Sequence, residues 1–434
     1  MDEHAEPRVL IVGAGAAGLF CAALLAEHPP GKVLLLEAQD RPGRKLRATG
    51  NGRCNLSNRF LGPGDYDHAP EFLGRLFVAV PPKLIHQTFE RWGLPLVERE
   101  RGRLFPQSEA ASSVLAVLLH RIEAAGFELR TGTRVLDLQR RPGRGYSVRC
   151  SDGSQLGCER LVLAMGSPSY APVRGGSEGF SLLSRWGYRL VPLRPALVPL
   201  TTHERWPEAL VGLKRLGRVS LLLRGRPLAT CEGDVLFTSY GLSGNAVLDL
   251  SLHVSGEPGE ELELSLLPEV PEASFETALR RSPYPLGIFL ALYLPEPQAK
   301  AWCMLLGFDP LRPSRTLQPR EISTLLASLY RQRLRCTGTR GLAEAQVSRG
   351  GVALEQVDPT TLESSLHPGC HLLGDCLDLC GRSGGFNLHL AWSTALLAAR
   401  TIVTDLNGTG SPASPERPLP RGPRRRDSRP RGNG

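Results

Sequence analysis

The chain has 434 residues, of which 41% are hydrophobic and 22% are charged, and its net charge is +9. This length allows two or three domains with buried cores, and the composition is that of an ordinary globular protein, which excludes a chain that is intrinsically disordered throughout. Every apolar run is shorter than the roughly eighteen residues that a membrane span requires. The first predicted strand starts at Val9, which leaves no room for a signal peptide, so we expect a cytoplasmic protein without a membrane partner. The ten cysteines show no zinc or redox spacing, and we expect thiols and no metal.

The N-terminal segment reads as a strand, a glycine turn, a helix and a second strand. The apolar run Val9–Val12 is typical of a buried parallel strand, and a helix is predicted over Leu19–Glu27. Val33–Leu36 is the second strand, and Glu37 ends it. Further along, the pattern predicts helices over 84–92 and 115–125 and strands over 128–130, 135–140, 146–150 and 161–164.

The texture changes after Pro192. Segments 196–203, 217–231 and 233–239 are strand-like, helical signals return over 272–335 with one helix at 321–335, and a last helix is predicted over about 388–405. We therefore expect a discontinuous nucleotide-binding domain of residues 1–190 and 340–408, interrupted by an inserted substrate domain of residues 191–339. Residues 409–434 are rich in Arg, Pro and Gly and predict a disordered basic tail, which either contacts RNA or only keeps the protein soluble.

The turn after the first strand carries the motif Gly13-Ala14-Gly15-Ala16-Ala17-Gly18. Gly13 allows a tight turn, Gly15 lets the backbone approach a pyrophosphate, and Gly18 allows close packing of helix and strand. The helix start at Ala16 and Ala17 faces the anion. Glu37 is expected to bond the adenosine ribose hydroxyls, which disfavours NADP. A glycine turn without a ligand is the alternative, and the motif alone fits NAD or FAD.

Three later segments favour FAD. The segment that ends in Ala164-Met165-Gly166 resembles the second FAD-contacting strand of glutathione-reductase-type flavoproteins, and Gly374-Asp375 resembles the motif whose acid binds the ribityl chain there. A glycine turn at Gly384 and Gly385 opens a helix through Asn387 and Leu388, and its N–H groups would stabilise negative charge on the reduced flavin. Val135, at the start of strand 135–140, is also assigned to the cofactor site.

The segment Gly43–Asn58 carries the most specific signature. Gly43-Arg44-Lys45, Gly52-Arg53-Cys54-Asn55 and Asn58 resemble the signature of the BaiN-like flavoproteins, a bacterial family also described as aminoacetone oxidase-like or as NAD(P)/FAD-dependent oxidoreductases. The resemblance extends over residues 8–405. It implies an α/β fold, with a Rossmann-type, glutathione-reductase-like FAD-binding domain and an inserted β-barrel plus helical domain. It also adds Arg44, Lys45, Gly50, Gly52 and Asn55 to the expected FAD site. Asn51, Asp375, Cys380 and Phe386 depart from the family pattern.

A bound flavin exchanges a hydride, and the protein decides with which partner. The chain shows no second strand–glycine–helix unit, so NADPH or NADH is expected only as a transiently bound reductant. Reduction of an activated C=C bond also requires an acid. Cys54 is the leading candidate because a thiol is protonated at neutral pH, and Arg53 would stabilise the enolate. The alternatives are a packing role for Cys54 and a structural or FAD-phosphate contact for Arg53, with Tyr240 and His389 as other proton donors.

The family resemblance offers three substrate classes: enones of steroid or bile-acid type, small amines such as aminoacetone, and a uridine of large-subunit ribosomal RNA that is reduced to dihydrouridine. Basic residues favour ribosomal RNA or its precursor as the partner, because cations supply affinity for phosphates. These basic residues lie in the tail and in the inserted domain. In the inserted domain they are Lys214, Arg215, Arg218, Arg224 and Arg226, together with Arg331, Arg333 and Arg335 on a predicted helix. A different class of function is an RNA-binding flavoprotein in which FAD is structural.

Overall fold

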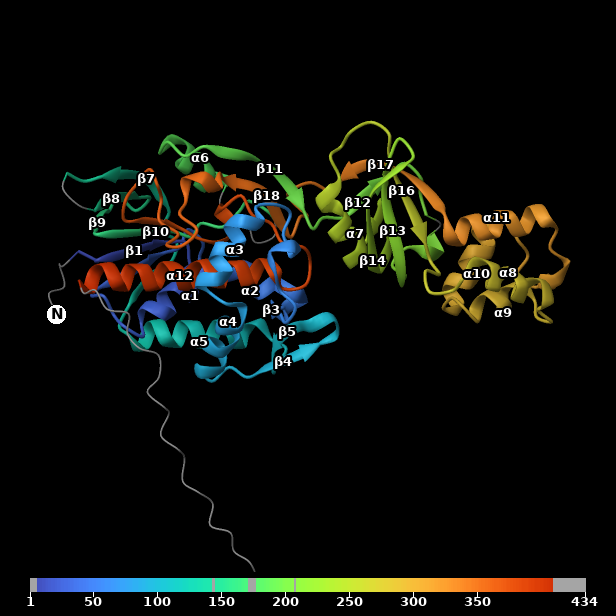
Figure 1. Cartoon of the computed structure of the whole chain (residues 1–434), viewed down its shortest axis with the longest axis horizontal. Helices are drawn as coiled ribbons and strands as arrows, with labels where there is room; N and C mark the ends of the chain where they lie inside the picture. The colour runs from blue at the N-terminus through green and yellow to red at the C-terminus, as the bar shows by residue number, and fades with distance from the viewer. Residues whose placement is uncertain (1–5, 143–144, 171–176, 207, 409–434) are drawn as a thin grey trace, which may run out of the picture.

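The computed structural model describes residues 6–142, 145–170, 177–206 and 208–408, so the predicted basic tail lies outside the described residues. Figure 1 shows an elongated molecule with an α/β part at one end, a barrel in the middle and a group of helices at the other end. Within the described ranges, no helix is both long enough and apolar enough to cross a membrane.

A five-stranded parallel sheet forms the centre of the α/β part. Its strands lie in the order β19-β10-β1-β2-β6. The side chains of β1 and β2 are buried along their whole length, as their unbroken apolar runs predict. The strand bounds are Val9–Val12 (β1), Val33–Leu36 (β2), Glu128–Arg130 (β6), Arg160–Leu163 (β10) and Cys370–Leu372 (β19).

The last helix, α12, packs on the first, so both ends of the described chain share one core (Figure 1). The Trp392 ring lies 5.1 Å from that of Phe20, and its indole N–H donates to the Leu56 carbonyl at 3.0 Å. The helices of this part are α1 (Ala16–Leu25), α2 (Arg44–Ala48), α3 (Pro70–Ala79), α4 (Pro82–Arg91), α5 (Ala111–Ala124), α6 (Ser177–Arg185) and α12 (Phe386–Asn407).

Three smaller sheets surround the central one. One of them, β3-β5-β4, holds the end of the signature segment against a hairpin. The strands are β3 (Ser57–Asn58), β4 (Leu96–Arg99), β5 (Arg103–Pro106), β7 (Val135–Arg140), β8 (Tyr146–Cys150), β9 (Gln155–Cys158), β11 (Leu190–Ala196) and β18 (Val347–Val352). The antiparallel pair β11-β18 lies where the chain passes toward the barrel and returns from it.

The middle part is a closed barrel in the order β12-β15-β14-β13-β16-β17, and pairing of β12 with both β15 and β17 closes it. Its strands are β12 (Leu200–Thr202), β13 (Lys214–Leu223), β14 (Arg226–Thr238), β15 (Gly241–Ser243), β16 (Glu260–Ser265) and β17 (Gln332–Thr339). Helix α7 (Asn245–Leu250) lies at the end that faces the α/β part (Figure 1). The outer helices are α8 (Glu272–Arg281), α9 (Leu286–Ala291), α10 (Glu296–Leu306) and α11 (Pro319–Tyr330).

The α/β fold with a Rossmann-type domain, a barrel and helices is therefore confirmed. The division into a discontinuous FAD-binding domain of residues 1–190 and 340–408 and an inserted substrate domain of residues 191–339 stays a prediction. The predicted helix over 321–335 is wrong in its last turn, because α11 ends at Tyr330 and residues 332–339 form β17. There Leu334 is buried between exposed Arg333 and Arg335, which is the two-residue alternation of a strand. The predicted bounds of the strands over 217–231 and 233–239 are also wrong, because Arg224 and Gly225 form a turn inside the first of them. The strands on either side of this turn are β13 and β14.

Candidate active site

A cavity of about 810 Å³ lies between the α/β part and the barrel. It brings together segments that are far apart in the sequence: the glycine turn, the signature segment, the ends of β10 and β19, and the start of α12. Most residues predicted for the site line it, namely Gly13, Gly15, Ala16, Ala17, Glu37, Arg44, Lys45, Gly50, Arg53, Asn55, Val135, Ala164, Gly166, Asp375, Gly384, Gly385, Asn387 and Leu388. Gly18, Gly52, Cys54 and Gly374 do not line it.

The glycine turn has the geometry of a phosphate cradle. A Cβ on Gly13 would lie 2.3 Å from the Ala164 carbonyl oxygen, and one on Gly18 would lie 1.9 Å from the Gly13 carbonyl oxygen. A Cβ on Gly15 would meet no atom within 4 Å, so the backbone there faces open space in the cavity. Gly15 is also the N-cap of α1 and supplies no side-chain cap to it. The first N–H groups of a ten-residue helix therefore point toward an open space that suits an anion.

Glu37 ends β2 beside this turn. Its Oε2 accepts the Ala14 N–H at 2.8 Å, and its Oε1 accepts the Gln39 N–H at 2.9 Å. Burial raises the pKa of the Glu37 carboxyl, and these two N–H groups oppose that rise. A carboxylate has further lone pairs, so Glu37 can brace the turn and still accept ribose hydroxyls.

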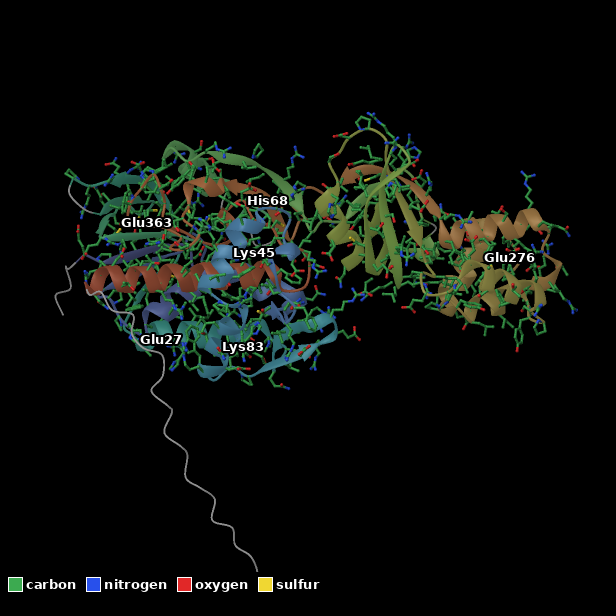
Figure 2. The ribbon with its side chains drawn as sticks, in the orientation of Figure 1. Glu27, Lys45, His68, Lys83, Glu276 and Glu363 are labelled. Atoms are coloured by element: carbon green, nitrogen blue, oxygen red, sulfur yellow. The ribbon has the colours of Figure 1, made fainter. Side chains whose placement is uncertain are left out.

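Lys45 joins three of the segments that form the cavity. Its Nζ donates to Asp375 Oδ2 at 2.9 Å and to Ser169 Oγ at 2.9 Å, and it lies 3.4 Å from Ser167 Oγ. Figure 2 labels Lys45 within the α/β part. Gly374, the residue before Asp375, has φ +64°, and its Cβ position is 3.2 Å from the Ala17 Cβ. Gly374 therefore acts by letting β19 approach α1, whereas Asp375 presents its carboxylate to the cavity.

The glycine loop before α12 is held by the asparagines of the signature segment. Asn58 donates from its side chain to the Gly384 carbonyl at 3.1 Å. Asn55, in the amide orientation that satisfies both neighbours, donates to the Ser57 carbonyl and accepts the Gly385 N–H, each at 3.2 Å. Because the Gly385 N–H is already bonded, it does not point to a flavin as we expected. The first turn of α12, which includes Asn387 and Leu388 of the lining, supplies the remaining N–H donors.

Arg53 reaches the cavity with its side chain about half exposed. Its guanidinium lies over the Phe105 ring at 5.1 Å and 3.5 Å from Glu109 Oε2. These contacts hold the cation at the cavity wall.

The expected proton donors lie outside the cavity. Cys54 is fully buried in the hydrophobic core, and burial raises the pKa of its thiol to about 12. This corrects the expectation that Cys54 delivers a proton, because its Sγ has no access to a substrate. His389 is also fully buried behind Ser57 Oγ, at 2.7 Å from Nδ1, and burial lowers its pKa to about 3. Tyr240 packs under the Arg340 guanidinium at 4.6 Å and does not line the cavity either.

Except for Lys214, which was expected to contact RNA, the residues of the second wall of the cavity were not predicted from the sequence. This wall is formed by barrel strands, α7 and the β4–β5 hairpin, whose sequences carry no cofactor motif. On the barrel and α7 it has six polar or charged residues and two leucines, namely Lys214, Leu216, Glu232, Asp234, Ser243, Asn245, Leu248 and Asp249. The hairpin adds Arg101 and Arg103, and the loop before α12 adds Arg382 and Ser383.

Several cations expected to attract RNA are engaged by carboxylates. Lys214 Nζ lies 2.8 Å from Asp234 Oδ2, and Arg218 Nε lies 2.6 Å from Glu232 Oε1. Arg333 pairs with both Glu261 and Glu263 on β16, and Arg331 pairs with Glu272. In contrast, Arg224 and Arg226 at the β13–β14 turn are exposed and form no ion pair with another described residue. Of the eight basic residues of the inserted domain predicted to attract RNA, four are paired with carboxylates, and Arg215, Arg224, Arg226 and Arg335 form no ion pair with another described residue.

These features fit FAD. The cavity offers an open backbone for a pyrophosphate at Gly15, a carboxylate for a ribose at Glu37, and a Lys45–Asp375 pair farther along the same channel. The fold and this site define a flavin-dependent oxidoreductase with a Rossmann-type FAD-binding domain.

Comparison with known proteins agrees with this class. The family model described as "HI0933-like protein Rossmann domain" matches residues 7–401, and the chain belongs to that family. It is 31% identical over 398 residues to the ribosomal RNA dihydrouridine synthase of Escherichia coli (strain K12), covering 91% of this chain and 97% of that protein. It is 32% identical over 417 residues to the 3-dehydro-bile acid delta(4,6)-reductase of Clostridium scindens, covering 91% of this chain and 99% of that protein.

Among solved structures, the 3-ketosteroid delta1-dehydrogenase of Sterolibacterium denitrificans superposes with a TM-score of 0.52 at 12% identity. The match covers 92% of this chain and 99% of that one, and at this identity it shows a shared fold. The resemblance to BaiN-like flavoproteins is confirmed by the family match and by the two relatives.

Proposed function

We propose that this enzyme reduces an activated C=C bond, and that its substrate is a uridine of large-subunit ribosomal RNA or its precursor. The observation that carries the substrate class is the polar second wall of the cavity. Lys214, Asn245 and Asp249 supply hydrogen-bond donors and acceptors of the kind that a pyrimidine ring with an N–H and two carbonyl groups requires. A steroid nucleus would instead require a mostly apolar wall.

Bound FAD would supply a hydride to the substrate. Around it, Gly13–Ala17 would hold the pyrophosphate, Glu37 the ribose, and Asp375 the ribityl chain. Arg53 would stabilise the negative charge that develops on a uracil carbonyl oxygen as the double bond is reduced. The proton then comes from a group that lines the cavity or from water, because Cys54 and His389 are buried elsewhere.

Two relatives bear on this choice. The names of the Escherichia coli protein and of its Haemophilus influenzae counterpart, which is 28% identical over 410 residues, support the ribosomal RNA substrate. The Clostridium scindens protein supports a second candidate, a steroid-type enone, at a similar identity. Leu216 and Leu248 would be the apolar contacts for such a ring.

Ribosomal RNA from a strain that lacks this gene tests the proposal. We expect dihydrouridine to be lost from a position in the large-subunit RNA and restored by the wild-type gene but not by a Gly15→Val variant. Unchanged dihydrouridine content would overturn the RNA substrate. Anaerobic turnover of a 3-oxo-4-ene steroid by the reduced enzyme, with the RNA unchanged, would favour the second candidate.

The electron donor requires a separate measurement. We expect anaerobic NADPH or NADH to bleach the flavin, with either nucleotide binding transiently in the same cavity. A flavin that stays oxidised would exclude a nicotinamide-driven reductase and favour an RNA-binding protein with structural FAD. Oxygen consumption with aminoacetone in the absence of nicotinamide would instead identify an amine oxidase.

A further inference from the structure

The barrel holds the glycine loop of the FAD-binding part through one side chain. Asp249, on α7, accepts the Ser383 N–H on Oδ1 at 2.6 Å and the Ser383 hydroxyl on Oδ2 at 3.0 Å. Both residues line the cavity, so this bond joins the barrel to the loop that precedes α12. Two donors on one carboxylate fix the position and the orientation of Ser383.

The position of Asp249 in its helix is unusual for a carboxylate. Its neighbours Leu248 and Leu250 are buried, and Gly244 at the start of α7 tolerates no side chain because a Cβ would lie 2.2 Å from the Asp234 carbonyl oxygen. Helix α7 therefore packs closely against β14. A carboxylate on such an element is costly unless it is hydrogen-bonded, and the two bonds from Ser383 meet this need. Burial raises the pKa of Asp249, and Ser383 and Arg382 oppose that rise.

Among the described residues, Ser383 makes the hydrogen bonds of this loop to α7, whereas Gly381 is bonded to the Asn387 side chain on the other side of the loop. Gly384 and Gly385 follow with φ +125° and +101°, which are conformations that glycine adopts readily and other residues do not. On the FAD side, Arg382 pairs with Asp65 at 2.6 Å, and the Gly384 carbonyl accepts from Asn58. Ser383 is the residue of this loop that bonds to α7.

We propose that Asp249 is a positioning residue: through Ser383 it sets the glycine loop and the entrance to the first turn of α12 against the flavin end of the cofactor site. The barrel then does more than bind substrate, because its placement determines the shape of the pocket around FAD. This inference holds for any substrate and depends only on FAD lying in the cavity.

The test uses the full-length FAD-loaded protein and three variants. Asp249→Ala removes both bonds, Ser383→Ala removes the hydroxyl bond and keeps the N–H, and Asp249→Asn keeps an acceptor for the N–H. We expect Asp249→Ala to raise the Kd for FAD by about tenfold, because FAD binding must then order a loop that the two bonds hold in place in the wild type. We also expect a shifted flavin absorbance band and faster hydrogen exchange at 381–385. Ser383→Ala should show a smaller change, and Asp249→Asn should retain most of the FAD affinity.

Ser251→Ala is the matched control. Ser251 Oγ accepts the Val198 N–H at 3.2 Å and donates to the Leu248 carbonyl, so it anchors the end of the same helix without contacting the glycine loop. We expect this variant to lower the melting temperature and leave the flavin spectrum and the FAD affinity unchanged. Wild-type FAD affinity, spectrum and loop exchange in Asp249→Ala would overturn the proposal. If Asp249→Ala does not fold, wild-type values of the same three quantities in Ser383→Ala overturn it.

Discussion

Gly15 allows the sharpest test of the cofactor placement, because it separates FAD binding from folding. The residue has φ −81° and ψ −166°, which valine adopts without strain, and a Cβ there meets no atom within 4 Å. In the apoprotein, Gly15→Val should therefore change the free energy of unfolding by less than about 1 kcal/mol.

The FAD complex should respond differently. The added methyl groups would occupy the space next to the first N–H groups of α1, and the pyrophosphate would lose its close approach to the backbone. If two charge-assisted hydrogen bonds of about 1.5 kcal/mol each are lost, FAD affinity falls by about 150-fold. The variant should purify colourless. Fluorescence titration with FAD measures the affinity, and urea unfolding of both apoproteins measures the stability.

Gly18→Ala is the control for this experiment. Its Cβ would lie 1.9 Å from the Gly13 carbonyl oxygen, so backbone must move, and we expect a loss of about 3 kcal/mol in apoprotein stability. A yellow Gly15→Val protein with wild-type FAD affinity would refute the placement of the pyrophosphate. A Gly15→Val apoprotein as unstable as Gly18→Ala would refute the inference that Gly15 faces open space.

Three further predictions concern other side chains of the α/β part. Lys45→Met removes the ammonium group that lies 2.9 Å from the Asp375 carboxylate and should lower FAD affinity by about tenfold in the same titration. An unchanged affinity would show that the Lys45–Asp375 pair does not shape the FAD site. Cys54→Ala should lower the free energy of unfolding in urea by about 1 kcal/mol and leave the rate at which substrate reoxidises the flavin unchanged. Loss of this rate in a folded, FAD-loaded variant would show that Cys54 is the proton donor after all. Hydrogen bonds to Asp378 and Asp67 raise the pKa of His68 from 6.5 to about 10 (Figure 2 labels this residue). The protonated His68 contributes its full stabilisation below pH 6.5, and this contribution disappears as the pH rises through 10. The free energy of unfolding of a His68→Asn variant should therefore be lower than that of the wild type by about 1–2 kcal/mol near pH 6 and equal to it near pH 10. This magnitude is reduced to account for solvent screening, because 38% of the His68 side chain is exposed.

The cofactor half of the site could be predicted because its signals are local. A strand, a glycine turn, a helix and a second strand occupy about thirty consecutive residues, so their pattern can be recognised in the sequence. The predicted bounds of the strands Val33–Leu36 and Val135–Arg140 agree with the structure. The later motifs at Ala164 and Asp375 were assigned from a resemblance, and the fold brings them to the same cavity.

The substrate half could not be predicted in the same way. Asp249 lies in a short helix of an inserted barrel, and its partner Ser383 is 134 positions away, so neither sequence segment indicates the contact. Cys54 was chosen because it lies within the signature, but a signature residue can serve packing as readily as chemistry. Arg331, Arg333 and Arg335 were predicted to lie on a helix. In the structure, residues 332–339 form strand β17 instead, because β17 pairs with β16.

The wide sequence separation within the cavity also has a consequence for biosynthesis. Lys45 meets Asp375 across 330 positions, and α12, which follows the glycine loop, packs on α1. Synthesis through Thr339 supplies all the strands of the barrel, whereas the cavity still lacks Asp375 and the start of α12. The site that we assign to the cofactor is complete only when α12 has been synthesised, so flavin binding follows synthesis of the residues through Asn407.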